Sequence, residues 1–279
     1  MRVIRVFPRK TSFTPTDAYA FVGNPPMIRP EADYVYISCV FSWDVEEAKR
    51  LFEAWEQYYK GITHIGGPAF ENDAGYFMPG RFVKQGITFT SRGCNNNCPW
   101  CLVPKREGKL RTDPVFRAGH IIQDNNLLQC HAPHIKSVFE MLRYQGKAAT
   151  FSGGIDATLV TDWFADELRT ITIDQIFLAA DTKSAITPLR KAVAKIGLPR
   201  NKVRCYALTK FDPNETIDQA EERMRLIWEA GAMPFAQLYQ PPERYIEYTY
   251  EWLAFQRTWQ RPAAMIARMK ALDSTGGAE

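Results

Sequence analysis

The stretch Thr90-Ser91-Arg92-Gly93-Cys94-Asn95-Asn96-Asn97-Cys98-Pro99-Trp100-Cys101 decides how the rest of the chain is interpreted. It holds three of the six cysteines, spaced C-x-x-x-C-x-x-C, directly after the apolar run Ile87-Thr88-Phe89. Thiolates this close together repel one another unless a metal neutralises them, and they are soft ligands suited to iron–sulfur clusters or zinc. Three ligands leave one coordination position open, which is typical of a metal site that does chemistry.

Three other interpretations of these cysteines stay open at this point. They are ordinary buried thiols, although a polar loop without hydrophobic periodicity fits that poorly. They bind zinc in a binding module, with a fourth ligand from Cys130, His131 or His134, although zinc ligands more often come as C-x-x-C pairs. They hold the cluster of an iron–sulfur electron carrier, which normally has four protein ligands.

The spacing, with an aromatic residue directly before the third cysteine, resembles the signature of the radical S-adenosylmethionine (SAM) superfamily. The resemblance implies that Cys94, Cys98 and Cys101 hold a [4Fe–4S] cluster whose fourth iron is chelated by SAM. It also implies that Trp100 lies near the cluster and the adenine. The implied activity is reductive cleavage of SAM to a 5′-deoxyadenosyl radical, which takes a hydrogen atom from a substrate. A flavodoxin- or ferredoxin-type donor supplies the electron.

Composition places limits on location and partners. The net charge of +4 is too mild to argue for nucleic acid by itself, and it does not exclude it. No apolar run approaches the ~18–20 residues of a membrane span, and the start of the chain lacks the apolar stretch of a signal peptide. Cys39, Cys130 and Cys205 are isolated in the sequence and set out no disulfide framework. We therefore expect a cytoplasmic protein.

Residues 1–84 are expected to form a small β-α-β region. Residues 1–33 are rich in proline and are expected to be an irregular lead-in. Asp44 followed by Glu47 predicts a helix N-cap with its capping partner. The predicted strands are Tyr34–Ser38 and Ile62–Ile65, and the predicted apolar helix face consists of Ala48, Leu51, Phe52, Trp55, Tyr58 and Tyr59.

This region resembles a stripped-down version of the cobalamin-binding domain that precedes the radical core in one branch of the superfamily. It is shorter, and it lacks the D-x-H-x-x-G signature that supplies the lower cobalt ligand. We interpret His64 as a structural histidine at a strand end. The region is then a remnant used for packing or substrate access.

Residues 85–240 show a regular alternation of strand and helix patterns. Strand-like runs recur about every thirty residues, the length of one β–α unit, at Ile87–Thr90, His120–Gln123, Ala148–Ser152, Gln175–Ala180, Val203–Thr209 and Pro234–Tyr239. Two apolar stripes predict helices, one stopped by Gly146 and one entered near Asp212-Pro213 and stopped by Gly231. The fold class is α/β with a parallel sheet, and the resemblance implies a partial (β/α)6 TIM-like barrel.

Active sites of β/α barrels lie at the carboxyl ends of the strands, and polar or glycine-rich groups follow every run here. After the second run, Asp124, Asn125 and Asn126 are candidates for SAM or substrate contact or are turn formers. After the third run, the family resemblance implies that Gly153-Gly154, with Asp156 beside them, contacts the amino group of SAM. The alternative is that the glycine pair forms a simple turn. After the fourth, Asp181 is either a ribose ligand or a helix N-cap.

Two further segments of the chain are rich in basic residues. Lys105, Arg106, Lys109 and Arg111 form either a clamp for a carboxylate or phosphate or a solvated loop. Residues 241–279 are expected to be a helical extension ending in a disordered tail from Ser274. Its interleaved aromatic and arginine residues cap the open side of the barrel or, as the less favoured alternative, bind nucleic acid. Small-molecule and nucleic-acid substrates both stay open.

Overall fold

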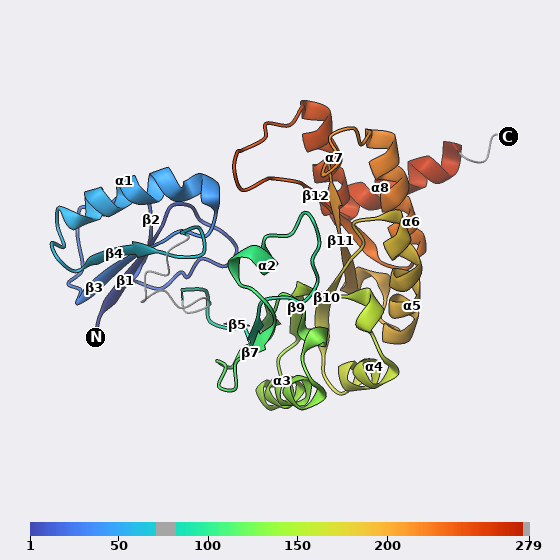
Figure 1. The fold of residues 1–279 in the computed structure, drawn as a ribbon, viewed down its shortest axis with the longest axis horizontal. Coiled ribbons are helices and arrows are strands. Elements are labelled where there is room, and N and C mark those ends of the chain that lie inside the picture. Colours follow the sequence, from blue (N-terminus) through green and yellow to red (C-terminus); the bar gives the residue numbers. More distant parts are fainter. Residues whose placement is uncertain (71–81, 276–279) are drawn as a thin grey trace. The chain divides into compact units, whose positions relative to one another are not determined.

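The computed structural model describes residues 1–70 and 82–275, which form two compact units. The first unit comprises Met1–Phe89 together with Pro241–Tyr245, and the second comprises Thr90–Gln240 together with Ile246–Glu279. Figure 1 shows the strands of the first unit in blue and those of the second from green to orange. Each unit is described by itself below.

The first unit is built on a four-stranded sheet in the order β2-β1-β3-β4, in which every neighbouring pair is parallel. The strands are β1 (Val3–Phe7), β2 (Ala20–Val22), β3 (Tyr34–Ser38) and β4 (Thr63–Gly66). Helix α1 (Val45–Glu56) lies along one face of this sheet (Figure 1), where Leu51 and Trp55 are fully buried. The predicted β-α-β pattern over β3, α1 and β4 is confirmed.

Three details of the first unit differ from what the sequence predicts. The proline-rich lead-in is not irregular, because its Val-Ile-Arg-Val-Phe run forms β1 beside β3 at the centre of the sheet. Asp44 occupies the N-cap position of α1, but its side chain makes no capping bond and instead binds the guanidinium of Arg9. Glu47 pairs with Arg50 rather than completing a capping box. Tyr58 lies beyond the helix and is exposed.

The second sheet has six strands in the order β12-β11-β10-β9-β8-β5, of which β8 to β12 lie in the second unit and β5 lies in the stretch that ends the first segment of the first unit. Strands β8 to β12 pair in parallel, each with its neighbour. In the described part of the chain the sheet is open, with β5 and β12 at its two ends. All six predicted strands are confirmed with small shifts at their ends: β5 (Ile87–Thr88), β8 (Ile121–Ile122), β9 (Ala149–Ile155), β10 (Ile173–Ala179), β11 (Val203–Thr209) and β12 (Met233–Leu238).

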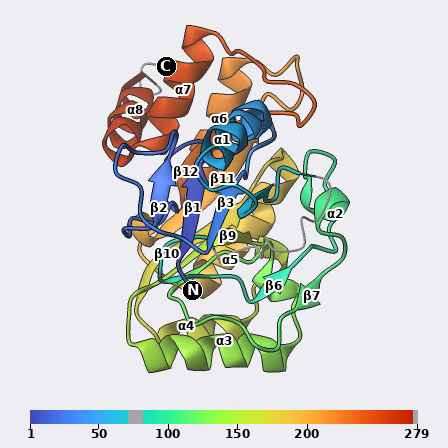
Figure 2. The same ribbon diagram turned by 90° about the vertical axis from the view of Figure 1, so that its left-hand side faces the viewer.

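Helices follow the strands of this sheet, and their apolar stripes form its core: α3 (Ala132–Gln145), α4 (Asp162–Arg169), α5 (Ile186–Ile196) and α6 (Ile217–Glu229). Helices α3 and α4 lie side by side in both views (Figure 2), where Arg143 pairs with Glu167 at 2.9 Å. Short 3₁₀ turns are η1 (Ser42–Asp44), η2 (Leu127–Gln129), η3 (Ala157–Leu159), η4 (Lys183–Ala185) and η5 (Arg200–Lys202).

The observed ends of the helices agree only in part with those predicted from the sequence. Gly146 ends α3 in the left-handed conformation, as predicted, because glycine adopts a positive φ without a Cβ clash. Helix α6 does not begin near Asp212-Pro213, because Thr216 and Gln219 form a capping box that starts it later.

The C-terminal segment forms α7 (Tyr250–Gln260) and α8 (Pro262–Thr275). Trp252, Phe255 and Trp259 belong to the main core of the second unit, which confirms the expected packing role for these three, whereas Tyr245 and Tyr250 are exposed. Ser274, predicted in the tail, is the penultimate residue of α8, and residues 276–279 lie outside the described residues. None of the helices in the described ranges combines the length and hydrophobicity that a membrane span requires.

Candidate functional site

The cysteine loop is bracketed by a two-stranded antiparallel ribbon at the carboxyl side of β5. Strand β6 (Ser91–Arg92) precedes the loop and pairs with β7 (Arg111–Thr112) after it. The four-residue helix α2 (Val103–Arg106) follows the third cysteine. The ribbon therefore fixes both ends of the segment that carries the thiols.

The three loop thiols are free and only partly buried. Burial raises the pKa of Cys98 and of Cys101, and the neighbouring cysteines raise both further because like charges repel. Cys98 and Cys101 therefore lie near enough to other loop cysteines for like-charge repulsion to act on them. A soft, mutually repelling donor set with no disulfide fits a thiolate-bound iron–sulfur cluster.

Among the described residues, no three His, Cys, Asp or Glu side chains converge where one metal ion would touch them all. The residues expected as a fourth zinc ligand make other contacts. Burial raises the pKa of the Cys130 thiol to about 11, and its hydrogen-bond partner is Ser91. His134 is buried, with its Nε2 3.0 Å from the Thr90 hydroxyl.

Gly93 makes the sharp entry into the loop possible. Its φ is 77°, and a Cβ at this position would lie 2.3 Å from the carbonyl oxygen of Lys109. Next to it, the Cys94 amide donates to the carbonyl of Gly108 at 3.2 Å. The backbone after the third cysteine therefore lies directly against the backbone before the first, which leaves room for no side chain at Gly93.

Asp124 anchors the residues before this turn. Its carboxylate, 1% exposed, accepts from the Thr90 amide at 2.6 Å, from the Thr90 hydroxyl at 2.5 Å and from the Ser91 hydroxyl at 2.7 Å. Gly153 packs directly against the backbone of Asp124, since a Cβ at position 153 would lie 2.0 Å from the Asp124 carbonyl oxygen. Asp124 is thus a buried structural hub beneath the loop, rather than a surface turn former.

Glu107 anchors Arg92 and Gly93, the two residues that follow Ser91. Its carboxylate accepts from the Gly93 amide at 3.1 Å, from the Asn125 side chain at 2.6 Å and from Arg92 at 3.3 Å. Asn125, predicted as a cofactor contact, therefore uses its amide group to tie Glu107 to the end of β8. Together Asp124 and Glu107 bind each of the four residues that precede Cys94.

Asn95 and Asn96 of the loop itself are held from η2 and from the end of β9. Gln129 accepts from the Asn95 amide at 2.8 Å and donates to the Asn96 side chain at 2.8 Å. The Asn96 side chain also donates to Asp156 at 2.8 Å. Burial alone would raise the pKa of Asp156, but hydrogen bonds from Thr158 and Asn96 outweigh it and lower that pKa. Asp156 is therefore an anionic anchor of the loop.

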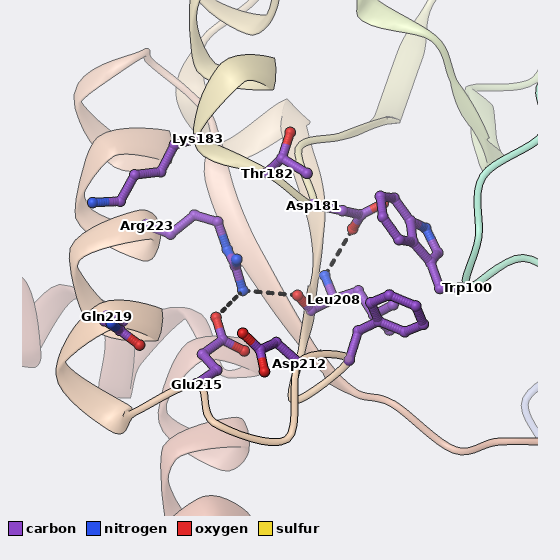
Figure 3. A pocket seen from close by; sticks show the side chains of 10 residues that line it. Trp100, Asp181, Thr182, Lys183, Leu208, Asp212, Glu215, Gln219 and Arg223 are labelled. Carbon is purple, nitrogen blue, oxygen red and sulfur yellow. Dashed lines mark hydrogen bonds and ion pairs between the residues drawn. The ribbon is translucent and has the colours of Figure 1, made fainter.

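A cavity of about 340 Å³ lies beside the loop (Figure 3). Trp100 of the loop lines it together with Asp181, which follows β10, and Leu208 of β11. The Asp181 carboxylate accepts from the Leu208 amide at 2.8 Å, so it is not the N-cap of a helix. Burial raises the pKa of Asp181. The lining thus offers an indole ring next to a carboxylate held in place by the sheet.

The far wall of the cavity is fixed by a shielded ion pair. Arg223 and Glu215 lie 2.7 Å apart with side chains 12% and 10% exposed, and Arg223 also donates to the Leu208 carbonyl at 2.8 Å. Glu215 accepts from the amide of Lys210 at 2.5 Å, where φ is 61°. This turn presents Phe211, whose ring meets the Trp100 ring edge-on at 5.4 Å. The indole is therefore positioned from both the loop and β11.

Several predicted site residues lie elsewhere than expected. Gly153 and Gly154 are inside β9, not after it. Gly154 has φ 103° and open space where a Cβ would be, so its backbone can approach a ligand. The predicted basic clamp consists of exposed residues on α2 and around β7, outside the cavity lining.

Sequence reasoning missed Glu107, Gln129, Glu215 and Arg223. Glu107, Gln129 and Arg223 contact residues fourteen or more positions away, and Glu215 contacts Lys210 and Arg223, so no recognised local motif marks these four. The only available signal was their position within a few residues of a predicted strand end or of the cysteines.

The comparisons with known proteins place the fold. No family model matches the chain, and no curated protein matches its sequence. A solved structure of the radical SAM methyltransferase TsrM from Kitasatospora setae, with cobalamin and a [4Fe–4S] cluster bound, matches at a TM-score of 0.52 and 11% identity. The match covers 85% of this chain and 74% of that chain. At this identity the likeness shows a fold shared with that structure.

Proposed function

We propose that this protein is a radical SAM enzyme in which Cys94, Cys98 and Cys101 hold a [4Fe–4S] cluster. The observation that carries the proposal is the juxtaposition of three free thiols with a cavity whose wall includes Trp100 of the same loop. A site for SAM needs both parts, since the cofactor must reach the cluster while its adenosine is enclosed. The zinc module and the simple electron carrier explain the thiols but give the cavity no role.

Within this proposal the chain's own residues bind and orient SAM. We assign Trp100 to the adenine, because its ring lines the cavity, and Asp181 to the ribose hydroxyls, because the sheet holds its carboxylate there. We assign Gly154 to the amino group of SAM, because its backbone is open to a ligand. Asn125 and Asp156 position the cysteine loop, since their polar groups already bind loop residues or Glu107.

When bound, the cluster supplies one electron that breaks a carbon–sulfur bond of SAM, giving methionine and a 5′-deoxyadenosyl radical that takes hydrogen from the substrate. A flavodoxin- or ferredoxin-type donor in a reducing cytoplasm would provide that electron. The six-stranded open sheet would serve as a partial barrel around the reaction. We do not propose cobalamin as a cofactor of this protein, because the ring of His64 stacks on that of Tyr36 at 5.3 Å and no D-x-H-x-x-G motif surrounds it.

Anaerobic reconstitution followed by reduction in the presence of SAM tests the proposal. We expect about four irons per chain and formation of 5′-deoxyadenosine and methionine. One zinc per chain without SAM cleavage would refute it, and a cluster that forms but never cleaves SAM would favour the electron carrier. Trp100→Ala should weaken SAM binding while leaving the iron content unchanged, which separates the cavity's role from that of the thiols.

A further inference from the structure

The carboxyl edge of the first unit's sheet has features that the proposed function does not use. All neighbouring strands in the order β2-β1-β3-β4 are parallel. The chain leaves β1 toward β2 on one side and leaves β3 toward β4 on the other, so its connections diverge between β1 and β3. In open α/β sheets, ligands bind at the carboxyl ends of the strands where such a divergence opens a crevice.

An ion pair spans this divergence. Arg9, which follows β1, donates from Nε to the Asp44 carboxylate at 2.6 Å and makes a second bond to it from a terminal nitrogen. Asp44, which follows β3, has a side chain only 8% exposed, whereas that of Arg9 is 52% exposed. The buried carboxylate thus fixes the guanidinium plane while leaving half of it open to solvent.

Aromatic rings stand beside this guanidinium. Phe41 and Trp43, in the loop after β3, stack at 4.9 Å with an angle of 9°, and Trp43 is 40% exposed. The Arg9 guanidinium lies 5.9 Å from the Phe41 ring centre. The segment Pro241–Tyr245 belongs to this unit, and the Tyr245 ring lies edge-on to Trp43 with the two ring centres 6.2 Å apart. Burying such rings would be favourable, yet Trp43 and Tyr245 both remain exposed.

We propose that this edge is a second binding site, for a planar heteroaromatic ring that stacks on Trp43 and lies beside the Arg9 guanidinium. A flat π surface next to a fixed planar donor group suits a ring with carbonyl or imine acceptors, such as a nucleobase or a flavin. The site does not depend on the cysteine loop.

A similar pair elsewhere in the unit provides a matched control. The Arg29 guanidinium lies 4.0 Å from the ring centre of Tyr58, which is 53% exposed. Tyr58 stands between α1 and β4, so this pair lies toward the amino end of β4. If an exposed aromatic residue beside an arginine were enough to bind a planar ring, both pairs would do so; the proposal requires only the pair at the strand divergence to bind.

Equilibrium dialysis of the full chain against FMN, riboflavin, AMP and inorganic phosphate tests the proposal. We expect saturable binding of at least one ring-containing probe, weakened about tenfold or more in Trp43→Ala and largely retained in Trp43→Phe. Arg9→Gln should weaken binding, whereas Tyr58→Ala and Trp100→Ala should not. The Trp100 variant keeps the cavity beside the cysteine loop from being mistaken for this site.

Three results would overturn the proposal. The first is no saturable binding of any ring probe up to about 1 mM. The second is binding that Trp43→Ala and Tyr58→Ala reduce alike, or that only Trp100→Ala removes. The third is a site for which inorganic phosphate competes but to which neither riboflavin nor AMP binds. A near-ultraviolet circular dichroism spectrum equal to that of the Trp43→Phe variant shows that Trp43→Ala has kept its fold.

Discussion

Both units carry polar groups at the carboxyl edge of a parallel sheet, but they hold them differently. In the second unit the cysteine loop is tied down by four side chains from separate segments, Glu107, Asp124, Gln129 and Asp156. In the first unit, among the residues that the structure describes, the ion pair of Arg9 with Asp44 joins two strand ends. The difference indicates what each edge must do, because several ligands at fixed mutual positions require many anchors, whereas a stacking surface requires few.

The largest expected effect separates the cysteines of the two units. Cys98→Ala should abolish both the reconstituted cluster and SAM cleavage, because the remaining thiolates cannot retain it. The matched variant Cys39→Ala removes a thiol that is fully buried in the first unit, and it should keep about four irons per chain. Equal iron content in the two variants would show that the loop thiols are not the ligands.

Thiol reactivity in the apo chain gives the next largest effect. Burial raises the pKa of Cys39 to about 12 and that of Cys130 to about 11. A raised pKa lowers the thiolate fraction at pH 8, and burial also denies access to the reagent. Iodoacetamide mapping by mass spectrometry should therefore modify the loop cysteines at least about tenfold faster. Preferential modification of Cys39 or Cys130 would contradict the observed burial.

Asp124 and Asp44, the anchoring carboxylates of the two edges, should differ in how much they contribute to the free energy of unfolding. Asp124→Ala leaves two buried hydroxyl donors without their charged acceptor, so we expect a loss of about 2–3 kcal/mol in the free energy of unfolding. Asp44→Ala should cost about 1 kcal/mol, because its partner Arg9 can turn to water. Urea unfolding of the apo chain measures both. A larger loss for Asp44→Ala would reverse the comparison.

A smaller effect is expected at the cavity wall. Asp181→Asn keeps the shape of the side chain and an oxygen for the Leu208 amide but removes the charge that we assign to the ribose hydroxyls. SAM affinity should fall about tenfold, with iron content unchanged. Arg190→Gln, on the exposed face of α5, is the control and should leave SAM affinity as it is. An unchanged SAM affinity in Asp181→Asn would contradict the assignment of Asp181 to the ribose hydroxyls.

Much of the second unit's sheet could be predicted because each strand is an apolar run repeated at a regular interval. Strands β1 and β2 could not, since the prolines around them suggested irregular chain, and only pairing with β3 makes the Val3–Phe7 run a central strand. The cysteines that we propose as ligands are marked by their spacing alone. The anchors are not, because Glu107 and Asp124 acquire their role only when the fold brings the loop against the end of β8.

The electron paramagnetic resonance spectrum of the reduced, reconstituted protein tests the central claim most directly. If one iron lacks a protein ligand and SAM completes its coordination, adding SAM should shift the g-values of the reduced [4Fe–4S] cluster, and the shift should persist in Tyr58→Ala. A cluster spectrum that SAM leaves unchanged at saturating concentration would contradict the account, because it would mean that the cofactor does not bind the iron held by Cys94, Cys98 and Cys101.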